Sequence, residues 1–292
     1  MAGEEVTRRQ VTADETVRVA CQQLAPSVGD VEANRRLTRE AVREAVAAGA
    51  RLVVLPELST SGYVFESPAE ARACAEPASG PSLRGWAEEA ARGDAVVVGG
   101  FCELGEDGAL YNSAAVVDAT GVLGVYRKIH LWDREQLFFE PGHACAPVLE
   151  TRAGWIGVAV CYDLYFPEVA RGLVLGGAEL IALPANLPRF PRPEERPMEV
   201  TLAMATAHLN HLFFALCDRC GPERGVEWVG GSVVCDEHGW PLAGPPADYG
   251  PGLVVADCDL SRARDKAWNE RNDVLGDRRP ELYAVGAPTR VA

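Results

Sequence analysis

The 292-residue sequence has little positive charge. It holds 28 Lys and Arg residues against 42 Asp and Glu residues, so its formal net charge is −14. Proteins that bind nucleic acid or an anionic membrane surface need clustered Lys and Arg against phosphate groups. The charge therefore argues against both kinds of partner, and we interpret the acidic surface as serving solubility.

Long apolar runs are also missing. No stretch approaches the roughly 18 uninterrupted apolar residues of a membrane span, and residues 1–15 lack the apolar core of a secretory signal. The 9 cysteines in 292 residues fall far below the density of a disulfide-stapled domain. We therefore expect a cytoplasmic protein with a flexible tail over residues 1–15 and a single domain over residues 16–292.

What the sequence does contain is an alternation of apolar strands and amphipathic helices, which predicts an α/β fold. The strongest strand signals are at 17–24, 52–55, 95–101, 112–118, 122–126, 155–160, 180–183, 212–217, 232–235 and 253–258. Helices are expected after Asp30 to residue 48, over 82–92, from Pro167 to residue 176 and over 195–210, with a loop at 184–197. Wholly apolar strands favour sheets buried on both faces, so we expect two packed sheets with helices outside.

Three reactive side chains come directly after such strands. Glu57 follows residues 52–55, Lys128 follows 122–126 and Cys161 follows 155–160. Ligands bind near strand ends in layered α/β folds, so these three side chains are candidates for one site. A thiol becomes a strong nucleophile only when deprotonated, and here Glu57 is the candidate base. Lys128 and the backbone N–H of Tyr162 are candidates to stabilise an oxyanion.

The segments around these residues resemble the nitrilase superfamily of carbon–nitrogen hydrolases. They are LPELSTSGY around Glu57, YRKIHLWDREQLFFEPG around Lys128 and CYDLYFPE from Cys161. The resemblance implies a four-layer αββα sandwich, a homodimer or higher homo-oligomer, and no metal or organic cofactor. It implies Glu57 as general base, Lys128 as stabiliser of the tetrahedral intermediate and Cys161 as nucleophile, with Glu135 as a fourth catalytic residue.

The same resemblance favours an amidase that acts on a small neutral amide. Relatives that bind a substrate carboxylate often carry an Arg a few residues after the nucleophile, and this sequence has none before Arg171. An unpaired buried carboxylate would be costly. The predicted substrate-binding residues are Tyr63, Trp132, Tyr162, Tyr165 and Asn186, with Phe139 and Phe190 as further apolar walls.

Several alternatives remain open at this point. A nitrilase has the same triad, and an N-carbamoyl or ω-amide hydrolase would be possible if Arg189 or Arg192 reached the site. The pairs His208/His211 and Cys217/Cys220 have a spacing that can bind zinc. A cysteine protease would need a partner His, and a non-catalytic scaffold protein on the same fold is the non-enzymatic alternative.

Overall fold

Two six-stranded sheets form the centre of the computed structural model, which describes residues 16–189 and 196–283. The predicted tail over residues 1–15 lies outside this range, and the assignment of residues 16–292 to one domain stays a prediction. In spatial order the first sheet contains β14 (Gly252–Asp259), β1 (Thr16–Gln23), β2 (Leu52–Val54), β3 (Val96–Leu104), β4 (Leu110–Asp118) and β5 (Gly121–Arg127).

The second sheet faces the first across a buried apolar core. In spatial order it contains β13 (Pro241–Ala243), β12 (Val233–Cys235), β9 (Phe213–Asp218), β8 (Leu180–Ala185), β7 (Gly154–Val158) and β6 (Val148–Thr151). In both sheets the central strands run parallel: β2 pairs with β1 and β3, and β8 pairs with β7 and β9. Parallel central strands buried on both faces explain the uninterrupted apolar runs of the sequence.

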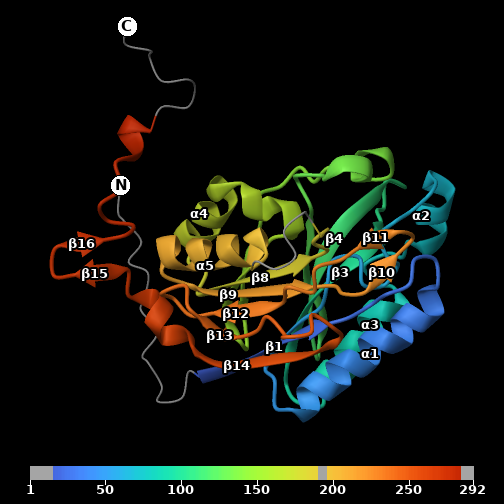
Figure 1. Ribbon diagram of the computed structural model, residues 1–292, viewed down its shortest axis with the longest axis horizontal. Coiled ribbons are helices and arrows are strands. Elements are labelled where there is room, and N and C mark those ends of the chain that lie inside the picture. Colours follow the sequence, from blue (N-terminus) through green and yellow to red (C-terminus); the bar gives the residue numbers. More distant parts are fainter. Residues whose placement is uncertain (1–15, 190–195, 284–292) are drawn as a thin grey trace, which may run out of the picture.

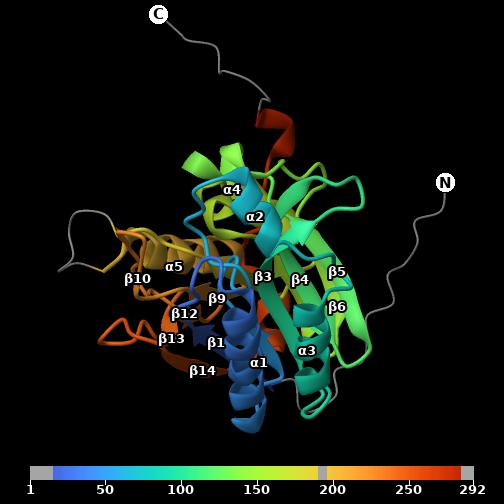
Figure 2. The ribbon, with the colours of Figure 1, turned by 90° about the vertical axis from the view of Figure 1, so that its right-hand side faces the viewer.

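Helices cover the outer faces of both sheets (Figures 1 and 2). Helices α1 (Val31–Ala47) and α3 (Pro81–Ala90) pack on the first sheet, and α4 (Pro167–Leu175) and α5 (Met198–Asn210) pack on the second. The smaller elements are α2 (Pro68–Cys74), the ribbons β10 (Pro222–Glu223) with β11 (Val226–Glu227) and β15 (Ala267–Asn269) with β16 (Asn272–Asp273), and 3₁₀ turns at Asp133–Leu137, Cys161–Tyr165, Leu260–Arg264 and Pro280–Leu282. The predicted αββα layering is confirmed.

Most element predictions are confirmed to within a few residues, including the Asp30 cap, whose Oδ1 accepts a 3.0 Å hydrogen bond from the N–H of Ala33. Two predicted boundaries are wrong. The loop expected at 184–197 starts later, because β8 continues to Ala185 by pairing with Asp218 of β9. The helix expected from residue 195 begins at Met198, with Pro197 as its capping residue. Among the described residues, no helix combines the length and the apolar character needed to cross a membrane.

Gly100 of β3 allows an unusually close approach between two backbone segments. A Cβ atom at this position would lie 2.4 Å from the Cα of Glu57 and 2.5 Å from the N of Leu58. The contact is fixed by hydrogen bonds from the N–H of Gly100 to the Pro56 carbonyl (3.1 Å) and from the N–H of Ser59 to the Gly100 carbonyl (2.9 Å). The position therefore has no space for any side chain.

We predict that Gly100→Ala lowers the free energy of unfolding by about 1–3 kcal/mol, because backbone must move to admit the methyl group. Gly172→Ala in α4 is the matched control, since a Cβ there meets no atom within 4 Å and Ala favours helix more than Gly. Urea unfolding followed by circular dichroism measures both variants. Equal stability of the two variants would contradict the close approach.

Candidate active site

The ammonium of Lys128 lies between two carboxylates in the interior of the protein. Its Nζ is 2.7 Å from Oε1 of Glu57 and 2.8 Å from Oε1 of Glu135. All three residues are buried, with exposed fractions of 0%, 1% and 3% for Lys128, Glu57 and Glu135. Charged groups are rarely buried to this degree unless they are paired, so the cluster is held as a unit.

The fold brings these residues to one end of the two sheets. Glu57 follows β2 and Lys128 follows β5, both in the first sheet, whereas Cys161 follows β7 of the second sheet. The predicted convergence of the three strand ends therefore occurs between two facing sheets. Glu57, Lys128 and Glu135 all lie close enough to the Cys161 thiol for their charges to act on it, so the four groups form one cluster.

Cys161 stands at a sharp turn between β7 and the 3₁₀ turn that it begins. Its φ of 45° lies in the left-handed region that residues other than glycine rarely adopt. Such strain is typical of a nucleophile held at a strand-to-helix turn. The thiol is 3.6 Å from the carbonyl oxygen of Asn186, and the side-chain amide of Asn186 donates a 2.9 Å hydrogen bond to the Glu57 carbonyl. Asn186 thus links the nucleophile to the backbone of the base.

Burial and the charges of the neighbouring groups together set the protonation states of the cluster. Burial raises the pKa of Glu57 to about 7, opposed by the charge of Lys128 and reinforced by that of Glu135. Burial and the nearby Glu57 raise the pKa of the Cys161 thiol well above its usual range, although Lys128 acts in the opposite direction. For Lys128, burial alone would lower the pKa, but the carboxylates of Glu135 and Glu57 raise it well above its usual range. The arrangement is a neutral thiol beside a carboxyl group that titrates near neutrality and a fixed cation.

Glu135 is fixed by three donors. Its Oε1 accepts a 2.5 Å hydrogen bond from the Tyr63 hydroxyl in addition to the contact with Lys128, and its Oε2 accepts a 3.2 Å bond from the N–H of Trp132. In contrast, Oε2 of Glu57 is buried without a hydrogen-bond partner among the described residues, while its Oε1 also accepts a 2.7 Å bond from the amide of Asn112. Glu57 is therefore the carboxyl group with a free oxygen to accept a proton.

Two adjoining cavities meet at this cluster and share Trp132 and Pro188. The larger has a volume of about 210 Å³, and half of the residues that line it are aromatic. The smaller, of about 20 Å³, is bordered by Cys161. The larger cavity is lined by Tyr63, Glu135 and Phe139 together with Phe65, Phe138 and Trp228. The smaller cavity is lined by Tyr162, Tyr165, Asn186 and Glu199. Each of the five predicted substrate-binding residues thus lines one of the two cavities, and their role in binding stays a prediction.

The loop that carries Asn186 is held by Asp218 at the end of β9. The buried Asp218 carboxylate accepts hydrogen bonds from the N–H groups of Leu187 (2.9 Å) and Gly231 (2.8 Å). Burial raises its pKa to about 7, although these backbone donors act in the opposite direction. Asp218 lines neither of the two cavities, and its contact with the site is through the N–H of Leu187 in this loop.

Some residues of interest were not found from the sequence. Asn112 had a signal, an amide at the start of the predicted strand 112–118. Trp228 lies in ERGVEWVGGS, a segment that also resembles the family, but nothing in it indicated a cavity residue, and Glu199 had no signal. Arg189 is described and its side chain is exposed. Phe190 and Arg192 lie outside the described residues.

The proposed zinc ligands do not converge. The rings of His208 and His211 contact Trp268, with centroids 4.8 and 4.1 Å away, whereas Cys217 lies in the core and donates to the carbonyl oxygen of Gln22. Among the residues that the structure describes, no group of three or more His, Cys, Asp and Glu side chains has metal-binding geometry.

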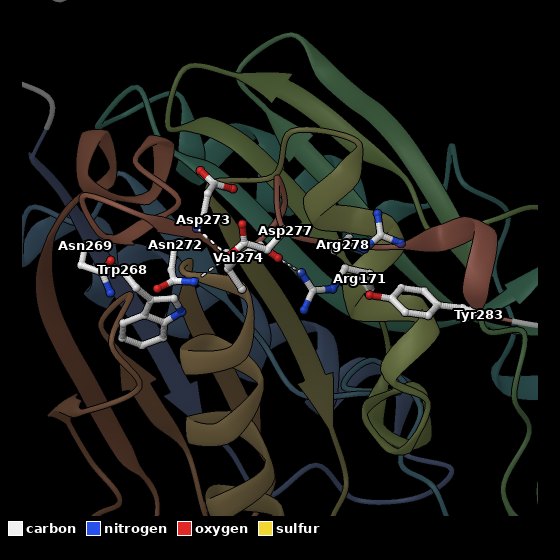
Figure 3. Close-up of a pocket in the computed structure, with 9 residues that line it drawn as sticks. All are labelled: Arg171, Trp268, Asn269, Asn272, Asp273, Val274, Asp277, Arg278 and Tyr283. Atoms are coloured by element: carbon white, nitrogen blue, oxygen red, sulfur yellow. Dashed lines mark hydrogen bonds between the residues drawn. The ribbon is translucent and has the colours of Figure 1, made fainter.

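A wider hollow of about 670 Å³ lies apart from this site, beside the β15–β16 ribbon. Figure 3 shows its lining, with Arg171, Tyr283 and Trp268 around an open depression. None of the predicted catalytic or substrate-binding residues lines it. This hollow is therefore not the candidate active site, although it is larger than the two cavities beside Cys161.

Comparisons with known proteins point to one family. The family model for carbon–nitrogen hydrolases matches residues 18–267. A protein named nitrilase from Pyrococcus abyssi is 37% identical over 268 residues, covering 91% of this chain and 99% of the relative. An (R)-stereoselective amidase from a Pseudomonas species is 33% identical, covering 90% of this chain and 92% of the relative.

Among solved structures, amidases are also similar to this chain. The amidase of Nesterenkonia sp. AN1 superposes with a TM-score of 0.74 at 29% identity, covering 91% of this chain and 98% of that one. A variant of that amidase carries acrylamide added to its active-site cysteine.

We predict that Lys128→Met costs about 3–5 kcal/mol of unfolding free energy at pH 8, because it leaves two buried carboxylates without their cation. The loss should be smaller at pH 5.5, where Glu57, with its pKa of about 7, is protonated and neutral. Denaturant titration at the two pH values measures this change.

Arg18→Met is the control for Lys128→Met, because the Arg18–Asp257 pair is a solvent-exposed ion pair. Its removal should cost far less, with little difference between the two pH values. An equal, pH-independent cost for both variants would contradict the buried charge cluster.

Proposed function

Since the chain belongs to the carbon–nitrogen hydrolase family, we propose that it is an amidase that converts a small amide to its acid and ammonia. The observation that carries the proposal is the buried Lys128 ammonium shared by Glu57 and Glu135 beside the Cys161 thiol. The group holds a nucleophile, a base near its titration midpoint and a fixed positive charge, which are the parts that acyl transfer needs. The amidases among its relatives support the choice of amide chemistry.

In the first half-reaction, the sulfur of Cys161 attacks the amide carbonyl carbon while Glu57 takes the thiol proton. The free Oε2 of Glu57 is the accepting atom, since Oε1 is already engaged by Lys128 and Asn112. The Lys128 ammonium and the N–H of Tyr162 stabilise the negative oxygen that forms. When the intermediate collapses, Glu57 returns the proton to the departing nitrogen, and ammonia leaves a thioester on Cys161.

In the second half-reaction, water attacks the thioester carbon as Glu57 takes a proton from the water. The carbon–sulfur bond breaks, the proton returns to the sulfur and the acid departs. Glu135 acts as a positioning residue in this scheme, because it holds Lys128 on one side and accepts from Tyr63 and Trp132 on the other.

The cavities favour an acyl group without a carboxylate. Six of the twelve residues around the larger cavity are Phe, Tyr or Trp, and the described part of the smaller one contains no Arg or Lys. Arg134 borders the larger cavity, with its guanidinium 6.0 Å from the ring of Phe138. We propose a neutral aliphatic or aromatic amide as the general substrate class, with the hydrocarbon part against Trp132.

A nitrilase is the second candidate, favoured by the name of the Pyrococcus abyssi relative. The same thiol would add to a nitrile carbon, and two waters would then release the acid and ammonia.

We propose further that the enzyme works in a reducing compartment such as the cytoplasm. All nine cysteines are free, as expected there. The proposed homo-oligomer is supported by large apolar side chains exposed on the outer helices, among them Leu175, Met198 and Leu209.

The test of the function is a panel of propionamide, benzamide, an ω-amide acid, a carbamoyl amino acid and propionitrile, with ammonia release as the readout. We predict turnover of the first two amides and at least about a thousandfold loss in Cys161→Ala. Intact-protein mass spectrometry should detect the acyl group on the wild-type enzyme. Preference for the ω-amide acid and the carbamoyl compound would overturn the neutral-amide proposal, and turnover by Cys161→Ala would overturn the mechanism.

We also predict that kcat/KM rises with pH through a midpoint near 7. Glu57 must be ionised to accept the thiol proton, and its raised pKa keeps it protonated below about 7. Asn112→Ala removes a hydrogen bond that favours the ionised form, so its midpoint should move to higher pH. A midpoint near 4 to 5, or one that Asn112→Ala leaves in place, would contradict Glu57 as the base.

A further inference from the structure

Glu199 is a carboxylate at the wall of the cavity that Cys161 borders, and the mechanism above does not use it. It lies in the first turn of α5 and is only 4% exposed. Its Oε1 accepts a 2.8 Å hydrogen bond from the hydroxyl of Tyr165, another lining residue. A carboxylate is favourably placed in the first turn of a helix, but that does not explain its position beside a nucleophile.

The Tyr165 hydroxyl supplies only part of what a buried carboxylate needs. Burial, followed by the hydrogen bond to Glu199, raises the pKa of Tyr165, so the phenol stays a neutral donor. Among the described residues, Tyr165 is the side chain that donates to Glu199, and none forms an ion pair with it. A carboxylate with two oxygens can accept several hydrogen bonds, and charged donors give the strongest ones.

The position of Glu199 relative to Cys161 determines which part of a substrate it meets. The carbonyl oxygen and the departing nitrogen belong beside Lys128 and Glu57, where the charged groups lie. The acyl chain then has the remaining part of the cavity that Cys161 borders, whose lining includes Tyr165, Asn186 and Glu199. Glu199 is thus placed to meet the far end of that chain.

We propose that Glu199 is a specificity-determining residue that selects amides whose acyl group ends in an ammonium or a comparable hydrogen-bond donor. The inference rests on the proposed amidase function and adds to it a preference among longer acyl chains, whose far end reaches Glu199. An ammonium would pair with the free acceptor positions of Glu199 in a poorly solvated cavity. A carboxylate at the same place would be repelled.

The test compares three chains of equal length: 5-aminopentanamide, hexanamide and adipic acid monoamide, which end in an ammonium, a methyl group and a carboxylate. The shorter pair, 4-aminobutanamide and pentanamide, repeats the comparison with a chain that lacks one methylene group. We expect wild-type kcat/KM to be about 10- to 100-fold higher for each amino amide than for its alkyl counterpart, and lowest for the carboxylate.

Glu199→Gln should reduce this preference for the ammonium about tenfold or more and should raise the relative rate of the carboxylate. Glu150→Gln in β6 removes one exposed charge away from both cavities and should leave the ratios unchanged. Tyr165→Phe should keep or increase the preference, because it frees Glu199 for the substrate. A purely structural role of Glu199 would instead lower the rates for all chains together in both the Glu199 and the Tyr165 variant.

The outcomes separate the two proposals. Absence of hydrolysis for every amide by the wild-type enzyme would overturn the amidase function itself. Hydrolysis of hexanamide at the same efficiency as 5-aminopentanamide, or ratios that Glu199→Gln does not change, would overturn only the selection by Glu199.

Discussion

One ammonium buried between two carboxylates is the interaction on which the rest of this site depends. Lys128 contacts Glu57 and Glu135 at 2.7 and 2.8 Å in a region almost closed to solvent. One cation among two carboxyl groups leaves an excess of negative charge, which burial makes costly. The excess is reduced if Glu57 binds a proton. Burial and Glu135 favour this protonated form and Lys128 opposes it, so that the pKa of Glu57 is about 7. A carboxyl group that would otherwise be ionised at neutral pH thereby becomes a base able to exchange protons there.

The scaffold serves mainly to hold this cluster against the nucleophile. Gly100 lets β3 approach the backbone of Glu57 so closely that no side chain fits between them. Asn186 then joins the two sheets, since its side chain bonds the Glu57 carbonyl and its own carbonyl contacts the Cys161 thiol. Asp218 fixes the loop of Asn186 through the N–H of Leu187 and also accepts a hydrogen bond from the N–H of Gly231. Because the base and the nucleophile follow strands of different sheets, the geometry of the site depends on how the two sheets pack.

The sequence pattern was sufficient to predict the layers of the fold and three members of the site, whereas Glu135 was implied only by the family resemblance. Buried parallel strands appear as continuous apolar runs, and Glu57, Lys128 and Cys161 each stand directly after such a run. Glu199 and Trp228 could not be predicted in this way, because they reach the cavities through the packing of α5 and of the loop after β11. Nor does the sequence reveal that the strand ends meet across two sheets, which depends on their pairing order.

The start of α5 shows how a local signal can mislead. Helix-favouring Glu and Arg residues precede Pro197 in the sequence, so composition placed the start at residue 195. Proline disfavours the helical conformation in the residue before it, and the structure has Pro197 as the capping residue of a helix that begins at Met198. The proline was therefore the better guide to this boundary than the composition around it.

Glu57 is the proposed proton acceptor, and burial beside Lys128 and Glu135 is the proposed source of its basicity. The most direct measurement is infrared difference spectroscopy of the protonated carboxyl stretch across about pH 5 to 9, in the wild-type protein and in Glu57→Gln. Asp218 titrates in the same range, so the difference between the two proteins isolates Glu57. The account predicts a carboxyl band that disappears with a midpoint near 7 in the wild type and is missing from the variant. Identical titrations in the two proteins would show that Glu57 does not change its protonation state in this range, and would contradict its role as the base.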